Sequence, residues 1–230
     1  NYLGSKRDVM TIAHEEGHAV HGLLAGKAQG TLQSHAPMAY AETASVFGEM
    51  TTFRFLQERL AKSGTTEERL ALVAGKIDDM MNTVVRQISF SEFERRTHGA
   101  HKRFSPEEFN ALWMEVTQEF YGPAGETFTY DNVERLWCYI PHFHRPFYVY
   151  GYAFGELLTQ SLYARAAEFG PRFEPLYLEM LRAGGSKDVV ELLAPFGLDP
   201  RSDQFWSDGI NVSLGRMVAE AEELAKNIVK

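Results

Sequence analysis

The stretch from Lys6 to Ala25 reads KRDVMTIAHEEGHAVHGLLA, and the interpretation of the whole chain starts from it. Its apolar residues recur at the spacing of a helix, which predicts a helix from Lys6 to Ala25. Gly26 and Gly30 are expected to end that helix and open a loop. Because apolar residues flank the charged centre on both sides, we expect the helix to be buried.

The centre of this helix, His14-Glu15-Glu16-Gly17-His18, is an H-E-x-x-H pattern. Residues four apart return to nearly the same helix face, so both histidines can hold one Zn²⁺. Glu15 lies about 100° further round, where a base for an attacking water belongs. Gly17 would allow another backbone to approach closely. His21 lies on the same face as His14 and is expected beside the metal ligands. The alternative is that both histidines form ordinary surface hydrogen bonds.

A catalytic zinc usually has three protein ligands, so the third must come from elsewhere. Glu42 is the best candidate, because it follows His18 by 24 residues and lies near the start of the next predicted helix. His35 is an alternative, although its surroundings resemble a loop. Glu49 follows Glu42 by seven residues and is expected to hydrogen-bond a histidine ligand and fix its ring. Glu49 could instead be a plain surface carboxylate.

Helical periodicity prevails elsewhere, and no convincing run of alternating strand residues occurs. The predicted class is therefore mainly α. We find no linker, so residues 1–230 are expected to form one catalytic domain. The further predicted helices are Tyr40–Ala61, one from Thr65 or Thr66 towards Thr97, one starting at Ser105, Asp131–Cys138, Phe147–Phe169, two short ones from Pro171 and Ser186, and Asp203–Val229.

Composition narrows the possible partners. The 230 residues carry a net charge of −8, which disfavours binding to nucleic acid. No run of 18 apolar residues predicts a membrane span. The one cysteine, Cys138, cannot form an internal disulfide. Because the lack of disulfides fits a reducing compartment, we expect a cytoplasmic location.

A second unusual stretch runs from Pro141 to Gly155 and reads PHFHRPFYVYGYAFG. On a helix, Tyr148 and Tyr152 would share a face and Tyr150 would lie opposite. An amide hydrolase needs hydrogen-bond donors aimed at the developing oxyanion, and tyrosine hydroxyls and imidazole N–H groups can supply them. The histidines and tyrosines of this stretch can supply such donors, with core packing as the alternative for the tyrosines.

Taken together, these motifs resemble the thimet oligopeptidase and oligoendopeptidase F family of zinc metallopeptidases. The resemblance rests on His14-Glu15-x-Gly17-His18-Ala19-x-His21, on Glu42-Thr43-Ala44-Ser45-x-Phe47-x-Glu49, and on the aromatic stretch. The lead-in Asn1–Ser5 and the ending Pro200–Leu224 are also similar, so it covers the whole chain. This chain departs from the family at Glu16, where a large apolar residue is usual.

The resemblance implies a zincin-type helical catalytic domain with one Zn²⁺ per chain, held by His14, His18 and Glu42. It assigns Glu15 as the base. It also implies that His142 with Tyr148 or Tyr150 binds the substrate backbone and stabilises the transition state.

The implied activity is zinc-dependent hydrolysis of peptide bonds in short oligopeptides. The chain begins with Asn1 just before the zinc motif, so the family's N-terminal half is expected to be missing. We therefore expect the chain to associate with itself or to need that half. One rival interpretation is a non-catalytic helical zinc-binding or interaction fragment. Another is a ferritin-like di-metal bundle, which needs a second Glu-x-x-His motif that this sequence lacks.

Overall fold

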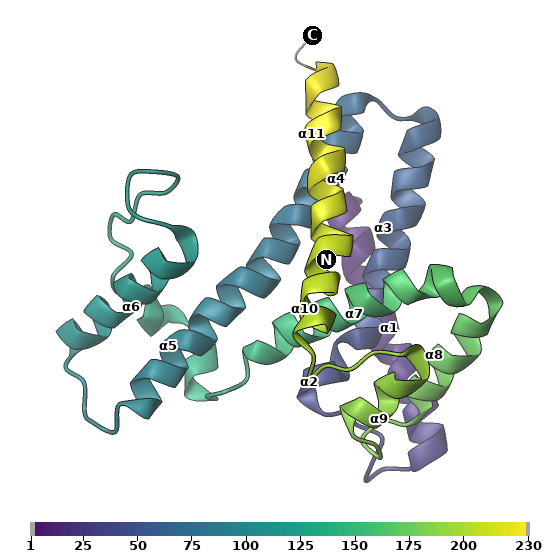
Figure 1. Cartoon of the computed structure of the whole chain (residues 1–230), viewed down its shortest axis with the longest axis horizontal. Helices are drawn as coiled ribbons and strands as arrows, with labels where there is room; N and C mark the ends of the chain where they lie inside the picture. Colours follow the sequence, from purple (N-terminus) through teal and green to yellow (C-terminus); the bar gives the residue numbers. More distant parts are fainter. Residues whose placement is uncertain (1–2, 229–230) are drawn as a thin grey trace. The chain divides into compact units, whose positions relative to one another are not determined.

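The computed structural model describes residues 3–228, and they fold as helices joined by turns and loops (Figure 1). Within this range no β-strand forms, which confirms the mainly α prediction. The α-helices are α1 Lys6–Gln29, α2 Met38–Ala41, α3 Thr43–Ser63, α4 Thr66–Met81, α5 Gln87–Gly99, α6 Pro106–Tyr121, α7 Tyr150–Phe169, α8 Phe173–Arg182, α9 Val189–Leu193, α10 Asp203–Gly209 and α11 Arg216–Ile228.

Shorter helical turns connect several of these elements. Two are π-helical, Asn82–Arg86 between α4 and α5 and Ile210–Gly215 between α10 and α11. Each π-helical turn joins its neighbours without a break. The two long helices predicted to start at Thr65 or Thr66 and at Asp203 are therefore confirmed as continuous helical stretches. The predicted end at Val229 lies outside the described residues. The 3₁₀ turns are Leu136–Tyr139, Pro141–His144, Gly170–Arg172 and Ala194–Phe196.

Local side chains explain where α1 and α6 begin. The Ser5 hydroxyl accepts a hydrogen bond from the Asp8 amide at 3.1 Å, and the Asp8 carboxylate accepts one from the Ser5 amide at 2.9 Å. Ser105 and Glu108 form the same capping box before α6, with Pro106 as the first helical residue. Such boxes satisfy amide groups that the first turn leaves unpaired. The helix start predicted at Ser105 is confirmed.

Several predicted boundaries were wrong, and the predicted helix Asp131–Cys138 forms only as the 3₁₀ turn Leu136–Tyr139. Gly26 lies inside α1, and the helix ends at Gly30, whose φ of +71° suits glycine. The predicted Tyr40–Ala61 helix is interrupted at Glu42, which caps both α2 and α3. The predicted Phe147–Phe169 helix starts only at Tyr150, because Phe147 has a φ of +66° that a right-handed helix cannot contain.

The chain forms two compact units. The first combines the chain up to Met80 with the chain from Phe154 onward, and the second spans Met81–Ala153. Both boundaries fall inside continuous helical stretches, near the end of α4 and within α7. This explains why the sequence contains no recognisable linker.

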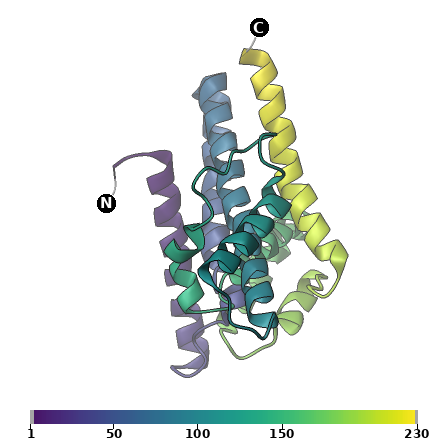
Figure 2. The same ribbon diagram turned by 90° about the vertical axis from the view of Figure 1, so that its left-hand side faces the viewer.

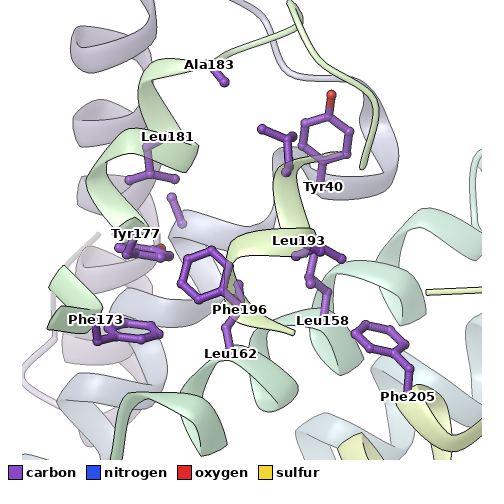
Figure 3. Packing of buried hydrophobic residues seen from close by; sticks show 12 residues of the cluster. Tyr40, Leu158, Leu162, Phe173, Tyr177, Leu181, Ala183, Leu193, Phe196 and Phe205 are labelled. Carbon is purple, nitrogen blue, oxygen red and sulfur yellow. The ribbon is translucent and has the colours of Figure 1, made fainter. Parts of the chain in front are cut away.

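In the first unit, two hydrophobic clusters hold the helices together. Helix α1 packs lengthwise on α3 and also contacts α8. One cluster joins α8 to α7 and the segment around α9, and Figure 3 shows Phe196 among Tyr177, Leu162 and Leu193. The other cluster joins α3 and α4 to α11, which runs beside them in Figure 2.

The second unit has an aromatic core. Phe90 and Phe93 from α5 pack against Trp113 from α6, with ring centroids 5.5 and 5.2 Å apart. Ile140 and Val149 complete this core. The segment that carries the predicted substrate-binding aromatics, between Pro141 and Tyr152, is therefore anchored on α5 and α6.

The prediction that the H-E-x-x-H helix is buried was wrong. Only His21 and Ala25 of α1 are buried, while Ile12, Val20 and Leu23 are 49%, 45% and 75% exposed. The apolar residues of α1 are spread around the helix rather than gathered in one stripe. One face packs on α3 and α8, and the remaining apolar side chains point to solvent.

Candidate metal centre

Three side chains from α1 and the α2–α3 junction converge on one point. His14 Nε2 lies 3.2 Å from His18 Nε2, and Glu42 Oε2 lies 3.4 Å from the first nitrogen and 3.3 Å from the second. All three residues are half-buried. Within residues 3–228, this is the one group of three or more potential ligands close enough to share a metal ion.

The dimensions of this triangle fit zinc. Ligand atoms about 2.1 Å from a tetrahedral metal ion lie about 3.4 Å from one another. The three separations, 3.2–3.4 Å, lie close to that value. The chemistry of these three side chains also suits a bound cation. Two imidazole nitrogens that face each other and one carboxylate need a shared proton or cation between them. Two histidines with one glutamate form a known type of catalytic zinc site.

Two glycines let the metal-site helices approach closely. A Cβ added to Gly17 on α1 would lie 2.4 Å from the carbonyl oxygen of Ala44, and one added to Gly48 on α3 would lie 2.5 Å from that of Ala13. Real Cβ atoms do not make such contacts, so both positions require glycine in this packing. The close approach expected at Gly17 is thereby confirmed. It brings the start of α3 within reach of the two histidines.

The position of Glu42 is fixed by its neighbours. The Ser45 hydroxyl donates to Glu42 Oε2 at 2.9 Å. A Cβ at Gly155 of α7 would come within 2.9 Å of the Glu42 Cβ, so this glycine makes room for the side chain. The hydrogen bond with His14 lowers the pKa of Glu42, burial opposes it, and Ser45 and the histidine charges add to the lowering. The carboxylate is thus held ionised and ready to bind a cation.

Glu49 fixes the ring of His14. Its Oε1 lies 2.6 Å from His14 Nδ1, and its Oε2 lies 3.2 Å from the ammonium group of Lys76. A proton on Nδ1 that is donated to Glu49 leaves the Nε2 lone pair free for a metal. Without a metal, the hydrogen bonds with Glu42 and then Glu49 raise the pKa of His14 to about 10, against the effect of burial, so a metal bound at Nε2 would displace the proton there.

The remaining predicted residues around this centre have different environments. Glu15 is exposed on α1, next to His14 in the chain. His21 is buried and lines a small space with Tyr40 and Thr43. Burial, and then the charge of His18, lowers the pKa of His21. Among residues 3–228, no hydrogen bond links His21 to either histidine ligand. His35 is exposed, and its Nδ1 lies 3.2 Å from the Ser34 hydroxyl oxygen, a hydrogen-bonding distance. It does not belong to the group formed by His14, His18 and Glu42.

In the second unit, His142 belongs to an aromatic group. Its Nε2 lies 3.2 Å from the Tyr152 hydroxyl, and its ring stacks on Tyr148 with centroids 5.8 Å apart. Tyr148 also meets Tyr152 edge to face at 5.3 Å. Tyr150 is 42% exposed and lies on the first turn of α7. His142 and Tyr148 are thus brought together, whereas Tyr150 has no ring contact with them among the described residues.

Glu94 of α5 holds the turn that leads into these tyrosines. It is 2% exposed, and its Oε1 accepts a hydrogen bond from the Phe147 amide at 3.1 Å. Phe147 is the residue with a positive φ, a conformation that costs a non-glycine residue about 1–2 kcal/mol. Burial raises the pKa of Glu94. The hydrogen bond therefore stabilises a strained turn that places Tyr148 outside α7.

Sequence reasoning missed the roles of Lys76, Glu94 and Tyr152. Lys76 gave a signal, because it interrupts the apolar face formed by Leu72, Val73 and Met80, and a lysine in such a place needs a buried partner. Tyr152 was noticed but placed on a helix face with Tyr148. The left-handed turn at Phe147 removes Tyr148 from that helix, and no sequence signal predicts that turn.

Comparison with known proteins finds peptidases that match most of this chain. A model of "Peptidase family M3" matches residues 3–212. An oligoendopeptidase F homolog of Lactococcus lactis subsp. lactis (strain IL1403) is 30% identical over 230 residues, which are 98% of this chain and 37% of that protein. Oligopeptidase PepF of Bacillus subtilis (strain 168) is 27% identical over 207 residues, covering 89% of this chain and 30% of that protein.

Solved structures agree with these matches. The crystal structure of oligoendopeptidase-F from Enterococcus faecium superposes with a TM-score of 0.75 at 26% identity, over 95% of this chain and 39% of that one. The chain thus spans less than two fifths of the length of these relatives. None of the helices within residues 3–228 combines the length and apolar character that crossing a membrane requires.

Proposed function

The chain belongs to peptidase family M3, and on that basis we propose that residues 1–230 are the catalytic part of a zinc-dependent endopeptidase that cleaves short oligopeptides. The observation that carries this proposal is the triangle of ligand atoms formed by His14, His18 and Glu42, with sides of 3.2–3.4 Å. We propose that these three residues hold one Zn²⁺ per chain.

A zinc ion in this triangle would supply a Lewis acid, which polarises a peptide carbonyl and makes a nearby water more acidic. Glu15 is the proposed general base. Its carboxylate accepts the proton that the attacking water loses and then delivers it to the nitrogen of the leaving amine. Its exposure on α1 supports this role, because substrate and water can reach it. Glu49 contributes by holding the Nδ1 proton of His14.

His142 with Tyr148 or Tyr150 is proposed to bind the substrate backbone and donate hydrogen bonds to the oxyanion. The contact between His142 Nε2 and the Tyr152 hydroxyl supports a fixed orientation of the imidazole ring. Tyr152 is therefore proposed as a residue that positions His142. Tyr150 is 42% exposed, which supports access to a substrate, and Tyr148 is oriented by stacking on His142.

The family and the covered length support a proposal for the substrate and partners. The relatives named as oligopeptidases and oligoendopeptidases are more than twice as long as this chain. We propose that oligopeptides are the substrates and that full activity needs the part of the relatives that this chain does not span. Self-association is the alternative way to cover exposed apolar residues such as Leu23. A cytoplasmic location stays a prediction that cell fractionation tests.

Metal analysis and a peptide assay test this proposal. The purified chain should contain one zinc per molecule. It should cleave a quenched fluorescent peptide weakly, and a chelator should stop the cleavage. Adding the part of the relatives that this chain does not span should make cleavage faster. A chain that binds no zinc would contradict the metal assignment. Zinc binding without any cleavage under either condition would favour the rival function, a non-catalytic zinc-binding fragment.

A further inference from the structure

Lys76 is a buried cation beside the metal centre. It lies on α4, its side chain is 2% exposed, and its ammonium group lies 3.2 Å from Glu49 Oε2. A lysine is almost never buried to this extent unless it is paired, because removing an ammonium group from water costs several kcal/mol. The partner here is the carboxylate that also holds His14.

Glu49 divides its two oxygens between these groups. Oε1 accepts from His14 Nδ1 at 2.6 Å, and Oε2 accepts from Lys76. A carboxylate fixed at both oxygens cannot rotate about its terminal bond without breaking one of these contacts. The position of the His14 ring, and hence of its Nε2, is therefore tied to a side chain on α4.

The charge of a second buried carboxylate also acts on this cation. Glu156 of α7 is 3% exposed, and its Oε1 accepts from Gln160, whose own oxygen accepts from Ser213 at 2.6 Å. Burial alone would lower the pKa of Lys76, but the charges of Glu156 and Glu49 outweigh it, and the net shift is upward. One ammonium group thus compensates two carboxylates from α3 and α7.

We propose that Lys76 is a positioning residue of the metal centre: it fixes Glu49 Oε2 so that Oε1 orients His14 and presents His14 Nε2 to the metal. This inference rests on the proposed function, since it concerns the same site. It goes further by assigning a role to a residue on α4 that is not a metal ligand and does not contact one. The competing explanation is that Lys76 only neutralises buried charge and stabilises the fold.

Zinc affinity separates these explanations. Glu49→Gln and Lys76→Met should each weaken zinc binding about 10–100-fold, the range for residues that orient a ligand, as measured by competition with a chelator. The double variant should bind zinc no more than about threefold more weakly than Glu49→Gln alone, because Lys76 acts through Glu49. Additive losses, or an unchanged affinity in Lys76→Met, would overturn the proposal.

Two further variants control for folding. Lys76→Met strands Glu156 without its cation, so the same substitution is also made in a Glu156→Gln background, where the second buried charge is gone. The loss of zinc affinity should be similar there, and circular dichroism should show native helicity. Lys76→Arg keeps the charge and should retain more affinity than Lys76→Met. If the wild-type chain itself binds no zinc, the proposed function fails. If the wild-type chain binds zinc and the Lys76 substitutions leave its zinc affinity unchanged, only this inference fails.

Discussion

Gly17 on α1 lies against the backbone of Ala44 on α3 so closely that an added Cβ would come within 2.4 Å of the Ala44 carbonyl oxygen. This contact sets the distance between the helix that carries both histidines and the helix that Glu42 caps. The metal centre therefore depends on a residue that contributes no side chain to it.

Replacing Gly17 should disturb both stability and the metal site. We expect Gly17→Ala to lower the free energy of unfolding by about 1–3 kcal/mol, the usual effect of overfilling a tight contact, and to weaken zinc binding. Gly22 is the matched control, because it lies on the same helix with open space around its Cβ position. Gly22→Ala should raise stability by up to about 1 kcal/mol, since alanine favours helix. Equal effects of the two substitutions in chemical denaturation would contradict this packing argument.

The base prediction separates chemistry from metal binding. Glu15→Gln keeps the size and shape of the side chain but cannot accept a proton. It should leave zinc stoichiometry unchanged and lower turnover by about 10²–10⁴-fold, the usual contribution of a general base. The measurement is peptide cleavage under conditions where the wild-type chain is active. Unchanged turnover with zinc in place would remove Glu15 from the mechanism.

The ligand prediction compares Glu42 with His35. Glu42→Ala removes one corner of the triangle and should weaken zinc by more than about 100-fold, beyond the range of residues that only orient a ligand. His35→Ala should have no effect, because His35 is exposed and bonded to Ser34. Zinc titration of both variants decides between the two candidates. The opposite pattern would mean that His35, not Glu42, is the third ligand.

Substitution of Tyr150 and Tyr148 by phenylalanine tests which hydroxyl stabilises the transition state. Tyr150→Phe removes one hydroxyl and should lower kcat about 10²–10³-fold with little change in KM, as for a lost oxyanion donor. Tyr152→Phe should have a smaller effect, because it only loosens His142. If Tyr148→Phe shows the large kcat effect instead, Tyr148 takes the role. Wild-type kinetics for both Tyr148→Phe and Tyr150→Phe would assign these rings to packing.

Glu94 is predicted to stabilise the turn at Phe147. Glu94→Leu removes the acceptor for a partly buried amide and should lower the free energy of unfolding by about 1–3 kcal/mol. Glu94→Gln keeps an oxygen at that position and should have a smaller effect. Urea denaturation of the two variants measures the difference. Equal stability of both variants would show that the hydrogen bond to Phe147 does not hold the turn.

The sequence determined the features that depend on residues close together in the chain. Helix geometry alone places His14 and His18 on one face, because their spacing of four matches one turn. The start of α6 follows from Ser105 and Glu108 in the same way, since their hydrogen bonds span three residues. Gly17 also signalled a close helix contact, because glycine is otherwise unfavourable inside a helix.

Only the tertiary structure decided what depends on contacts between distant segments. Glu42 and His35 were both possible ligands, and the packing of α3 on α1 brings Glu42 alone to the histidines. Lys76 reaches Glu49 from another helix, and Glu94 supports a turn 53 residues further along the chain. The burial of α1 was also mispredicted, because it depends on contacts with helices that are distant in the sequence. Local hydrogen bonds and spacing set a helix, but its neighbours determine which of its faces is covered.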